Sequence, residues 1–285
     1  MRAKLLLFAA LTATIGFGAV VTDHRRTPYV GAVAIDAATG RVLLADAADR
    51  ECYPASCTKL MTARLLLKAV REGKVAPNEL LVQSKRSAAE VPSKLDLLPG
   101  EKISVKNAMT ALMLKSANDV AVIVAERLGG TVEGFAAMMN AEAKNLGMAD
   151  TVFVSPNGLP PPKGSKRGFD RSSAADLAKL GRAIVREQPE ILNFTRMASA
   201  TVPGRGGKPL TLQNHNEFLW RQGLKMSEVD GLKTGYIDAG GSSIVLTGTR
   251  NGRRALVVVV GSSSKKERDT HAGRLLRDAL DALSW

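Results

Sequence analysis

Residues 54–67 read PASCTKLMTARLLL, in which a proline lies two positions before a Ser-x-x-Lys motif and a long apolar run follows. Proline is favoured in the first turn of a helix, so this stretch predicts a long apolar helix from Ser56 to Glu72. Residues three apart lie on the same face of a helix. The Lys59 amine is therefore expected to reach the Ser56 hydroxyl.

The pairing of Ser56 with Lys59 meets a chemical requirement of acyl transfer. A serine hydroxyl is a weak nucleophile until a base removes its proton, and a lysine ammonium cannot be that base. Burial, the positive end of the helix dipole and a second nearby cation all disfavour the charged form, so we expect a lowered pKa for Lys59. Lys233 is the candidate for the second cation.

Two further motifs follow in order along the chain. Ser116-Ala117-Asn118 separates the apolar stretches 105–114 and 120–125, which predicts a polar turn between two helices. Lys233-Thr234-Gly235 precedes the β-rich run 242–249 and predicts a strand that offers an ammonium and a hydroxyl to a substrate carboxylate. Gly235 there would let a substrate backbone approach closely. Together, the three motifs predict a serine acyl-transferase site.

Other matches to these short patterns also occur. Ser262/Lys265 and Ser263/Lys266 have the Ser-x-x-Lys spacing, and Ser155-Pro156-Asn157 has the Ser-x-Asn spacing. The last of these lies in a segment rich in proline and glycine, which is typical of a surface loop. The proline and the apolar helix that flank Ser56 favour this serine as the nucleophile.

The chain resembles the D-alanyl-D-alanine carboxypeptidases of the low-molecular-mass penicillin-binding protein group, which are relatives of the serine β-lactamases. The resemblance covers roughly residues 28–283 and extends past the three motifs to VAIDAATGRVL at 33–43, PASCTKLMT at 54–62 and VDGLKTG at 229–235. It implies a serine peptidase that cleaves the D-Ala-D-Ala bond of peptidoglycan stem peptides and is acylated by β-lactam antibiotics.

The resemblance implies three catalytic residues. Ser56 would attack the carbonyl of the D-Ala-D-Ala bond, Lys59 would take its proton, and Ser116 would relay a proton to the leaving amine. The backbone N–H groups of Ser56 and Tyr236 would form the oxyanion hole, which stabilises the developing negative charge.

The resemblance also implies a substrate-binding set, which comprises Asn118, Lys233, Thr234, Gly235, Tyr236 and Arg268. Asn118 would hold the substrate amide and orient Lys59. Lys233 would tune the electrostatics beside Ser116, and Thr234 would bind the terminal carboxylate. Arg268 aligns with an arginine that helps to bind this carboxylate in the family, and a solvated surface cation is the alternative.

Three positions depart from the family pattern. Cys57 stands where a larger apolar residue is usual, Tyr236 where histidine is common, and His215 where arginine is frequent. We expect His215 to be structural, with contact to the cleft as the alternative. Cys52 and Cys57 would share an oxidising compartment. A disulfide beside the nucleophile would constrain the site, so we expect two free thiols, with a Cys52–Cys57 disulfide as the alternative.

Within the same superfamily the main alternative is a serine β-lactamase, which hydrolyses its acyl-enzyme with a carboxylate-activated water. Glu187 and Glu190 superficially resemble the loop that carries this carboxylate, but they close a predicted helix far along the chain from Ser116, so we expect both to be structural. Penicillin should then acylate the protein and leave slowly. Two further alternatives are a DD-endopeptidase that cuts cross-links and a non-catalytic wall-binding or antibiotic-sensing protein.

The chain is basic, with a formal net charge of +13 over 285 residues. This charge fits anionic wall polymers and lipid head groups, and we expect no nucleic-acid partner. His24, His215 and His271 are widely separated and no Cys/His ligand spacing occurs, so neither a metal nor another cofactor is expected.

The predicted layout is α+β, with an antiparallel sheet flanked by helices and a separate helical lobe. The predicted strands are 30–36, 41–45, 242–249 and 255–261, and the predicted helices are 56–72, 105–114, 118–128, 132–146 and 172–187. Asn251-Gly252 predicts a hairpin between the last two strands. The final segment, 268–285, should form a helix packed on the sheet, with a membrane-surface helix as the alternative.

The amino terminus has the pattern of an export signal. Arg2 and Lys4 precede the apolar stretch 5–21, so residues 1–22 are expected to be an export signal, with an uncleaved N-terminal membrane anchor as the alternative. Residues 28–285 would then form a single catalytic domain without a C-terminal β-domain. Such an enzyme would be periplasmic or associated with the cell wall.

Overall fold

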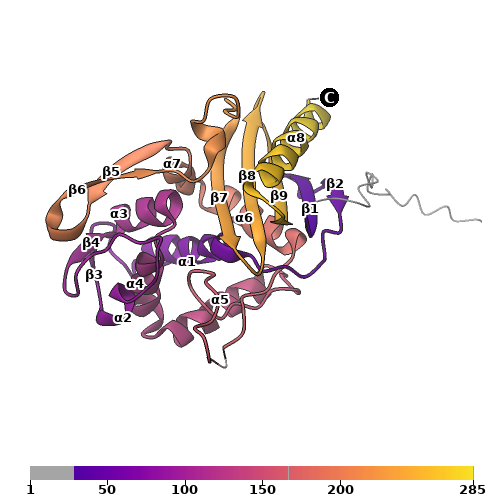
Figure 1. Cartoon of the computed structure of the whole chain (residues 1–285). Helices are drawn as coiled ribbons and strands as arrows, with labels where there is room; N and C mark the ends of the chain where they lie inside the picture. Colours follow the sequence, from indigo (N-terminus) through magenta and orange to yellow (C-terminus); the bar gives the residue numbers. More distant parts are fainter. Residues whose placement is uncertain (1–28, 166, 285) are drawn as a thin grey trace, which may run out of the picture.

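The structure, a computed structural model, describes residues 29–165 and 167–284, so the predicted export signal lies outside the described residues. One half of the molecule is a five-stranded antiparallel sheet with the order β2-β1-β9-β8-β7 (Figure 1). The strand bounds are Gly31–Asp36 for β1, Val42–Asp46 for β2, Val229–Ile237 for β7, Gly241–Arg250 for β8 and Arg253–Ser262 for β9. The predicted strands and the hairpin at Asn251-Gly252 are confirmed.

Both faces of the sheet are covered by helices, which explains the unbroken apolar run in β9. Val257 and Val259 belong to the core under α8 (Lys265–Leu283), whereas Val258 and Val260 belong to the core shared with α6 (Ala174–Glu187). Alternate side chains of a strand point to opposite faces, so a strand buried on both sides needs apolar residues throughout. The C-terminal segment is thus a helix packed on the sheet, as predicted.

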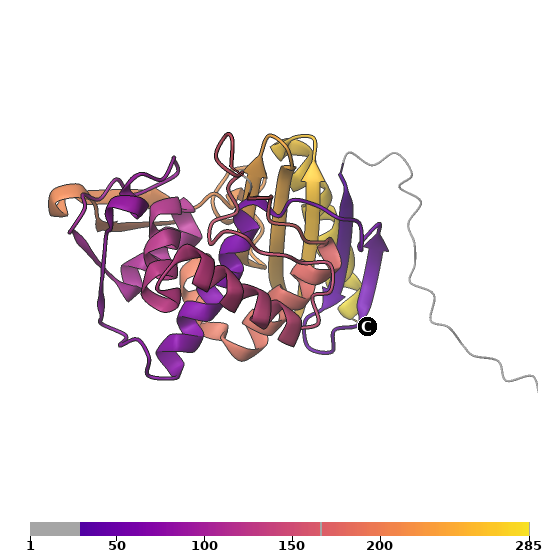
Figure 2. The same ribbon diagram turned by 90° about the horizontal axis from the view of Figure 1, so that it is seen from below.

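The other half is a helical lobe (Figures 1 and 2). Its helices are α1 Lys59–Arg71, α2 Lys85–Ala88, α3 Val105–Thr110, α4 Asn118–Gly129 and α5 Val132–Asn145. Two small antiparallel strand pairs belong to this half. In one, β3 (Leu80–Val82) pairs with β4 (Lys102–Ser104), and in the other β5 (Ser199–Pro203) pairs with β6 (Pro209–Gln213). The short α7 (Leu192–Thr195) lies between α6 and β5. Within the described residues no helix has the length and apolar character needed to cross a bilayer.

Helix α1 runs through the middle of the lobe, and most of its side chains are buried. It is preceded by the 3₁₀ turn η1 (Ala55–Thr58), which lies against the edge strand β7. Gly235 makes this approach feasible, because a Cβ atom there would lie 2.9 Å from Pro54 O and 3.0 Å from Ser56 N. The start of α1 is therefore held at the junction of the sheet and the lobe.

A buried ion network fixes the far part of α1. The Arg64 guanidinium lies 2.7 Å from a Glu142 carboxylate oxygen and 2.7 Å from Glu187, and Lys68 lies 3.0 Å from Glu142. Glu190 pairs with Arg71 at 2.6 Å. Glu187 and Glu190 are thus engaged with α1, which confirms the expectation that both are structural.

Replacing Glu142 with glutamine is expected to destabilise the fold by about 1.5 to 3 kcal/mol, because it removes the one buried carboxylate that pairs with Arg64 and leaves only the more exposed Glu187. Burial acts to raise the pKa of Glu142, but hydrogen bonds from Lys68 and Arg64 outweigh it and hold the pKa below 4.5. The stabilisation is therefore present above pH 4.5 and is lost as the pH falls through the lower folded value. Urea unfolding at neutral and acidic pH measures both effects.

The matched control for this prediction is Glu133→Gln. Glu133 forms an ion pair with Arg86 at 3.1 Å, but its side chain is 74% exposed. Exposed pairs contribute at most about 1 kcal/mol. Equal losses of stability in the two variants would contradict the assignment of a buried network.

Candidate active site

Ser56 and Lys59 meet as their spacing predicted. Ser56 lies in η1, Lys59 is the first residue of α1, and the Lys59 Nζ and Ser56 Oγ atoms are 3.0 Å apart. The Lys59 side chain is fully buried. Burial, and after it the charge of Lys233, lowers the pKa of Lys59 well below 10.5, which confirms the expected direction.

Two carbonyl oxygens complete the surroundings of the Lys59 amine. Its Nζ lies 2.7 Å from Asn118 Oδ1 and 2.7 Å from the backbone oxygen of Asn157. Carbonyl oxygens only accept hydrogen bonds, so both contacts need an N–H of the amine. A neutral amine has two N–H donors and one lone pair. With both donors engaged, its lone pair is left for the Ser56 hydroxyl.

The segment 155–158 is not the surface loop that its proline and glycine content predicted. Ser155 and Asn157 are buried, and a nearly buried carboxylate, Asp170, holds the segment in place. Asp170 accepts hydrogen bonds from the backbone N–H of Val154 and from both the N–H and the hydroxyl of Ser155. These bonds satisfy the backbone of an inward-turned loop, which composition alone does not reveal.

Gly158 allows this loop to pack against η1, the turn that carries Ser56. Its φ is +79°, and a Cβ atom there would lie 1.9 Å from Ala55 O. Gly158→Ala is therefore expected to displace the Asn157 carbonyl from Lys59 and to slow acylation by penicillin about a hundredfold. Gly164→Ala is the matched control, because Gly164 has a φ of +80° but no neighbour within 4 Å of the added atom. Similar rates for the two variants would contradict this role of the close approach.

Ser116 and Asn118 enter the site from the turn between two helices. After α3 the chain widens into a π turn at Ala111–Lys115, and Ser116 then adopts a left-handed conformation with a φ of +59°. This geometry ends the predicted helix 105–114 differently from an ordinary cap. The Ser116 hydroxyl is buried, and in the described part of the chain it has no hydrogen-bond partner. A buried polar group without a partner in a cleft is typical of a binding or catalytic role.

Lys233 lies on β7, the strand that packs against the turn η1. It is 1% exposed, and its ammonium donates to the backbone oxygen of Thr234 at 2.9 Å. Burial, together with the charge of Arg268, lowers the pKa of Lys233 to about 8. Lys233 is thus the second cation that the sequence predicted for Lys59.

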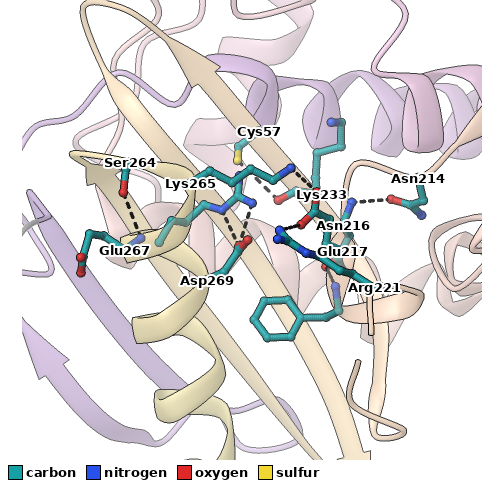
Figure 3. Close-up of polar contacts among 12 residues, drawn as sticks. Cys57, Asn214, Asn216, Glu217, Arg221, Lys233, Ser264, Lys265, Glu267 and Asp269 are labelled. Atoms are coloured by element: carbon teal, nitrogen blue, oxygen red, sulfur yellow. Dashed lines mark hydrogen bonds and ion pairs between the residues drawn. The ribbon is translucent and has the colours of Figure 1, made fainter. Parts of the chain in front are cut away.

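Both cysteines are free and buried. The Cys57 thiol donates to the backbone oxygen of Lys233 at 3.7 Å, so it joins the turn to β7 (Figure 3). Burial raises the pKa of Cys57 to about 11, which keeps it a thiol at neutral pH. The expectation of free thiols is confirmed.

Glu217, Lys265 and Arg268 are the charged residues that line the cleft. Figure 3 shows Glu217 and Lys265 together with Asp269. Arg268 is 4% exposed and lies 2.7 Å from Asp269, so the alternative of a solvated surface cation is wrong. Glu217 forms ion pairs with Lys265 from the start of α8 and with Arg221. Acidic neighbours therefore hold Arg268 and Lys265 at the cleft.

The cleft between these groups has a volume of about 420 Å³. Its lining brings together Ser56, Ser116, Asn118, Thr234, Gly235, Tyr236 and Arg268 from the predicted set, with Lys59 and Lys233 beneath them. Tyr236 is 62% exposed, and its hydroxyl donates to Asp238.

Some cleft residues were not predicted from the sequence. His215 is exposed and lines the cleft, which is the contact that the sequence left as an alternative to a structural role. Desolvation within the cleft, followed by the charges of Lys233 and Lys115, lowers the pKa of His215 to about 4, so it is neutral at neutral pH. Leu159, Glu217 and Lys265 also line the cleft. Among the described residues no group of three or more His, Cys, Asp or Glu side chains could hold a metal ion.

Comparison with known families agrees with this geometry. Residues 27–264 match the family model described as D-alanyl-D-alanine carboxypeptidase (peptidase S11). The chain belongs to the D-alanyl-D-alanine carboxypeptidase family. This membership confirms the resemblance, and the solved structures of the family confirm the α+β fold class.

Three relatives show how far the D-alanyl-D-alanine carboxypeptidase family match extends. The D-alanyl-D-alanine carboxypeptidase DacD of Salmonella typhimurium is 34% identical over 86% of this chain. Penicillin binding protein 6B from Escherichia coli is 32% identical, with a TM-score of 0.77 over 88% of this chain and 76% of its own. Penicillin-Binding Protein D2 from Listeria monocytogenes, solved in a cefotaxime-bound form, is 28% identical with a TM-score of 0.76 over 89% of this chain and 97% of its own. This chain spans 61% of the length of the Salmonella protein.

Proposed function

We propose that this chain is a serine DD-peptidase that cleaves the D-Ala-D-Ala bond of peptidoglycan stem peptides through an acyl-enzyme on Ser56. The observation that carries the proposal is the fully buried Lys59 amine, held 3.0 Å from Ser56 Oγ by two carbonyl oxygens. The activity for which the family and its relatives are named supports the choice of substrate.

The first half of the reaction follows from this arrangement. The lone pair of neutral Lys59 takes the Ser56 proton as the oxygen attacks the carbonyl carbon. The backbone N–H groups of Ser56 and Tyr236 would stabilise the oxyanion, because both residues line the cleft where the charge develops. The Ser116 hydroxyl then relays this proton: it donates its own proton to the departing amine of the terminal D-Ala and takes one back from protonated Lys59. Water would release the acyl group in the second half.

The remaining residues bind the substrate. Asn118 orients Lys59 through its Oδ1 atom, and its Nδ2 donates to Val91 O, so the side chain is fixed from both ends. Thr234 and Arg268 offer a hydroxyl and a buried cation to the terminal carboxylate, with the charge of Lys233 behind them. Gly235 leaves space for the substrate backbone. A β-lactam would acylate Ser56 in the same pose.

The pH dependence of D-Ala release should reflect two lysines. The rate rises with pH as Lys59 loses its proton. Because the pKa of Lys59 is lowered, this rise is complete at a lower pH than the titration of an ordinary lysine. The rate falls above pH about 8, where Lys233 loses the charge that attracts the substrate carboxylate. Values of kcat/KM from about pH 5 to about pH 10 measure both limbs. A rate that keeps rising through this range would contradict the assignment of Lys233.

The fate of a penicillin adduct separates the peptidase from a β-lactamase. Glu217 is the single carboxylate among the described residues that line the cleft, and it is tied to Lys265 and Arg221. A carboxylate free to activate water is therefore not at hand, and we expect the adduct to persist for minutes or longer. Labelling with a fluorescent penicillin, followed by a chase with unlabelled antibiotic, measures its lifetime. Loss of the adduct within seconds would favour the β-lactamase.

Release of D-Ala from a synthetic pentapeptide tests the activity itself. An adduct without any cleavage of the peptide would favour the non-catalytic, antibiotic-sensing alternative. Cleavage of purified cross-linked dimers in preference to the pentapeptide would favour a DD-endopeptidase. Mass spectrometry of the products distinguishes the two cuts, since both are acyl transfers with different leaving groups.

We further propose that the enzyme is exported and works in the periplasm or at the cell wall, where its substrate is located. The pattern of residues 1–22 supports export, with an N-terminal membrane anchor as the alternative, and residues 28–285 would form the catalytic domain. Cell fractionation with N-terminal sequencing of the mature protein tests cleavage and location together.

A further inference from the structure

A second cavity lies beside the catalytic cleft. Its volume is about 630 Å³, against about 420 Å³ for the cleft, and Leu159 lines both. Asn157 lies between the two spaces. Its backbone oxygen accepts a hydrogen bond from Lys59, and its side-chain Nδ2 donates to Glu90 at 3.1 Å. The two cavities are therefore separated by one short segment of chain.

The second cavity contains one carboxylate that is not neutralised by contact. Glu90 is partly buried, and within the described residues its only hydrogen bond comes from Asn157 and no cation lies at ion-pair distance. The two arginines of the cavity are engaged elsewhere. Arg86 pairs with Glu133 at 3.1 Å, and Arg167 donates to the backbone oxygens of Val154, Leu159 and Pro160.

The rest of the cavity suits an aliphatic chain that ends in a cation. Val91, Val122, Val132 and Pro156 supply apolar wall beside the Glu90 carboxylate. Burial raises the pKa of Glu90, so its charge is poorly compensated in the free protein. An ammonium group on the end of several methylenes would bury its carbons against the valines and satisfy this carboxylate.

We propose that the second cavity is a subsite for the side-chain amine of the diamino acid that precedes D-Ala-D-Ala in the stem peptide, with Glu90 as the specificity-determining residue. This inference rests on the proposed function. Glu90 is linked to Ser56 through only two residues, Asn157 and Lys59. An extended residue spans about 3.5 Å, and a side chain of four methylenes adds more than that, so the amine can reach Glu90 while the scissile carbonyl lies at Ser56.

The subsite would select uncross-linked stems. The side-chain amine carries a positive charge when it is free, but in a cross-link it becomes a neutral amide. An amide would leave the partly buried Glu90 carboxylate without a cation. The structure thus favours removal of the terminal D-Ala from free stems over cleavage of cross-links.

Three short peptides test the proposal in the full-length protein. Each peptide ends in D-Ala-D-Ala, and the three differ in the residue before it. That residue is lysine with a free side-chain amine, lysine acetylated on that amine, or a residue with a side-chain carboxylate of similar length. We expect kcat/KM for D-Ala release to be about tenfold higher for the free amine than for the acetylated form, the size of one charge-assisted hydrogen bond. The acidic peptide should be cut most slowly.

Variants at Glu90 separate recognition from structure. Glu90→Gln keeps an oxygen for Asn157 and should bring the ratio of free to acetylated peptide close to one. Glu90→Lys should reverse the order and favour the acidic peptide, which a purely structural residue would not do. Glu72→Gln makes the same charge change at the far end of α1, where Glu72 pairs with Lys74, and should keep the tenfold ratio.

The outcomes distinguish this inference from the proposed function. Equal rates for the three peptides, or a preference that persists in Glu90→Gln, would overturn the subsite while D-Ala release still supports the peptidase. Absence of D-Ala release from all three peptides, with Ser56 still acylated by penicillin, would overturn the proposed function and the subsite with it.

Discussion

Ser56→Ala is expected to abolish covalent labelling by penicillin and to lower D-Ala release about a millionfold, the usual loss when a serine nucleophile is removed. No other described group can replace it. The neighbouring Cys57 is buried, and its raised pKa keeps it protonated. Gel fluorescence after incubation with a labelled penicillin, with peptide mapping of the adduct, measures the result.

Cys57→Ala is the matched control for this variant. It removes the thiol next to Ser56, at the cost of a small cavity and one weak contact to the Lys233 carbonyl. Labelling should persist at close to the original rate. An adduct in Ser56→Ala that disappears in the double variant would transfer the chemistry to the cysteine and reject the proposed nucleophile.

Lys59→Met should slow acylation about a hundredfold to ten-thousandfold, the range expected for loss of a general base. Methionine fills a similar volume but offers neither a lone pair for the Ser56 proton nor donors for the carbonyl oxygens of Asn118 and Asn157. These two buried acceptors would then lack donors, which should also lower the stability of the fold. Stopped-flow acylation and thermal unfolding measure the two consequences separately.

A pH profile shows whether Lys59 acts as the base or only as a structural donor. If it is the base, the residual rate of Lys59→Met should no longer rise across the acidic limb. Lys144→Met, at the exposed end of α5, should leave both the rate and the profile unchanged. An intact acidic limb in Lys59→Met would assign that limb to a different group.

The sequence predicted the parts of the site that depend on local spacing. Ser56 and Lys59 are three positions apart on one turn, so helix geometry alone brings them together. The strands of the sheet were predicted because their apolar runs and the Asn251-Gly252 turn are local signals as well. The expected burial of Lys59 and the structural roles of Glu187 and Glu190 followed from the positions of these residues on the predicted helices.

The parts that were missed depend on contacts between distant segments. The Asn157 carbonyl reaches Lys59 because Asp170 turns the segment inward, and composition favoured a surface loop there. Contact of His215 with the cleft was only the alternative expectation, because the position of this residue depends on the path of the chain after β6. No residue pattern indicates that path. The left-handed Ser116 follows from a π turn that ordinary helix signals do not indicate.

The three contacts of the Lys59 amine also have a practical use. Two of them join chain segments 59 and 98 residues apart, and the Cys57 thiol contacts β7 across 176 residues. A molecule with any of these segments displaced would lack a competent nucleophile. Stoichiometric capture of a β-lactam would therefore count the natively assembled molecules in a preparation, and the reagent could serve as an active-site titrant for refolding yields and for the stability of variants.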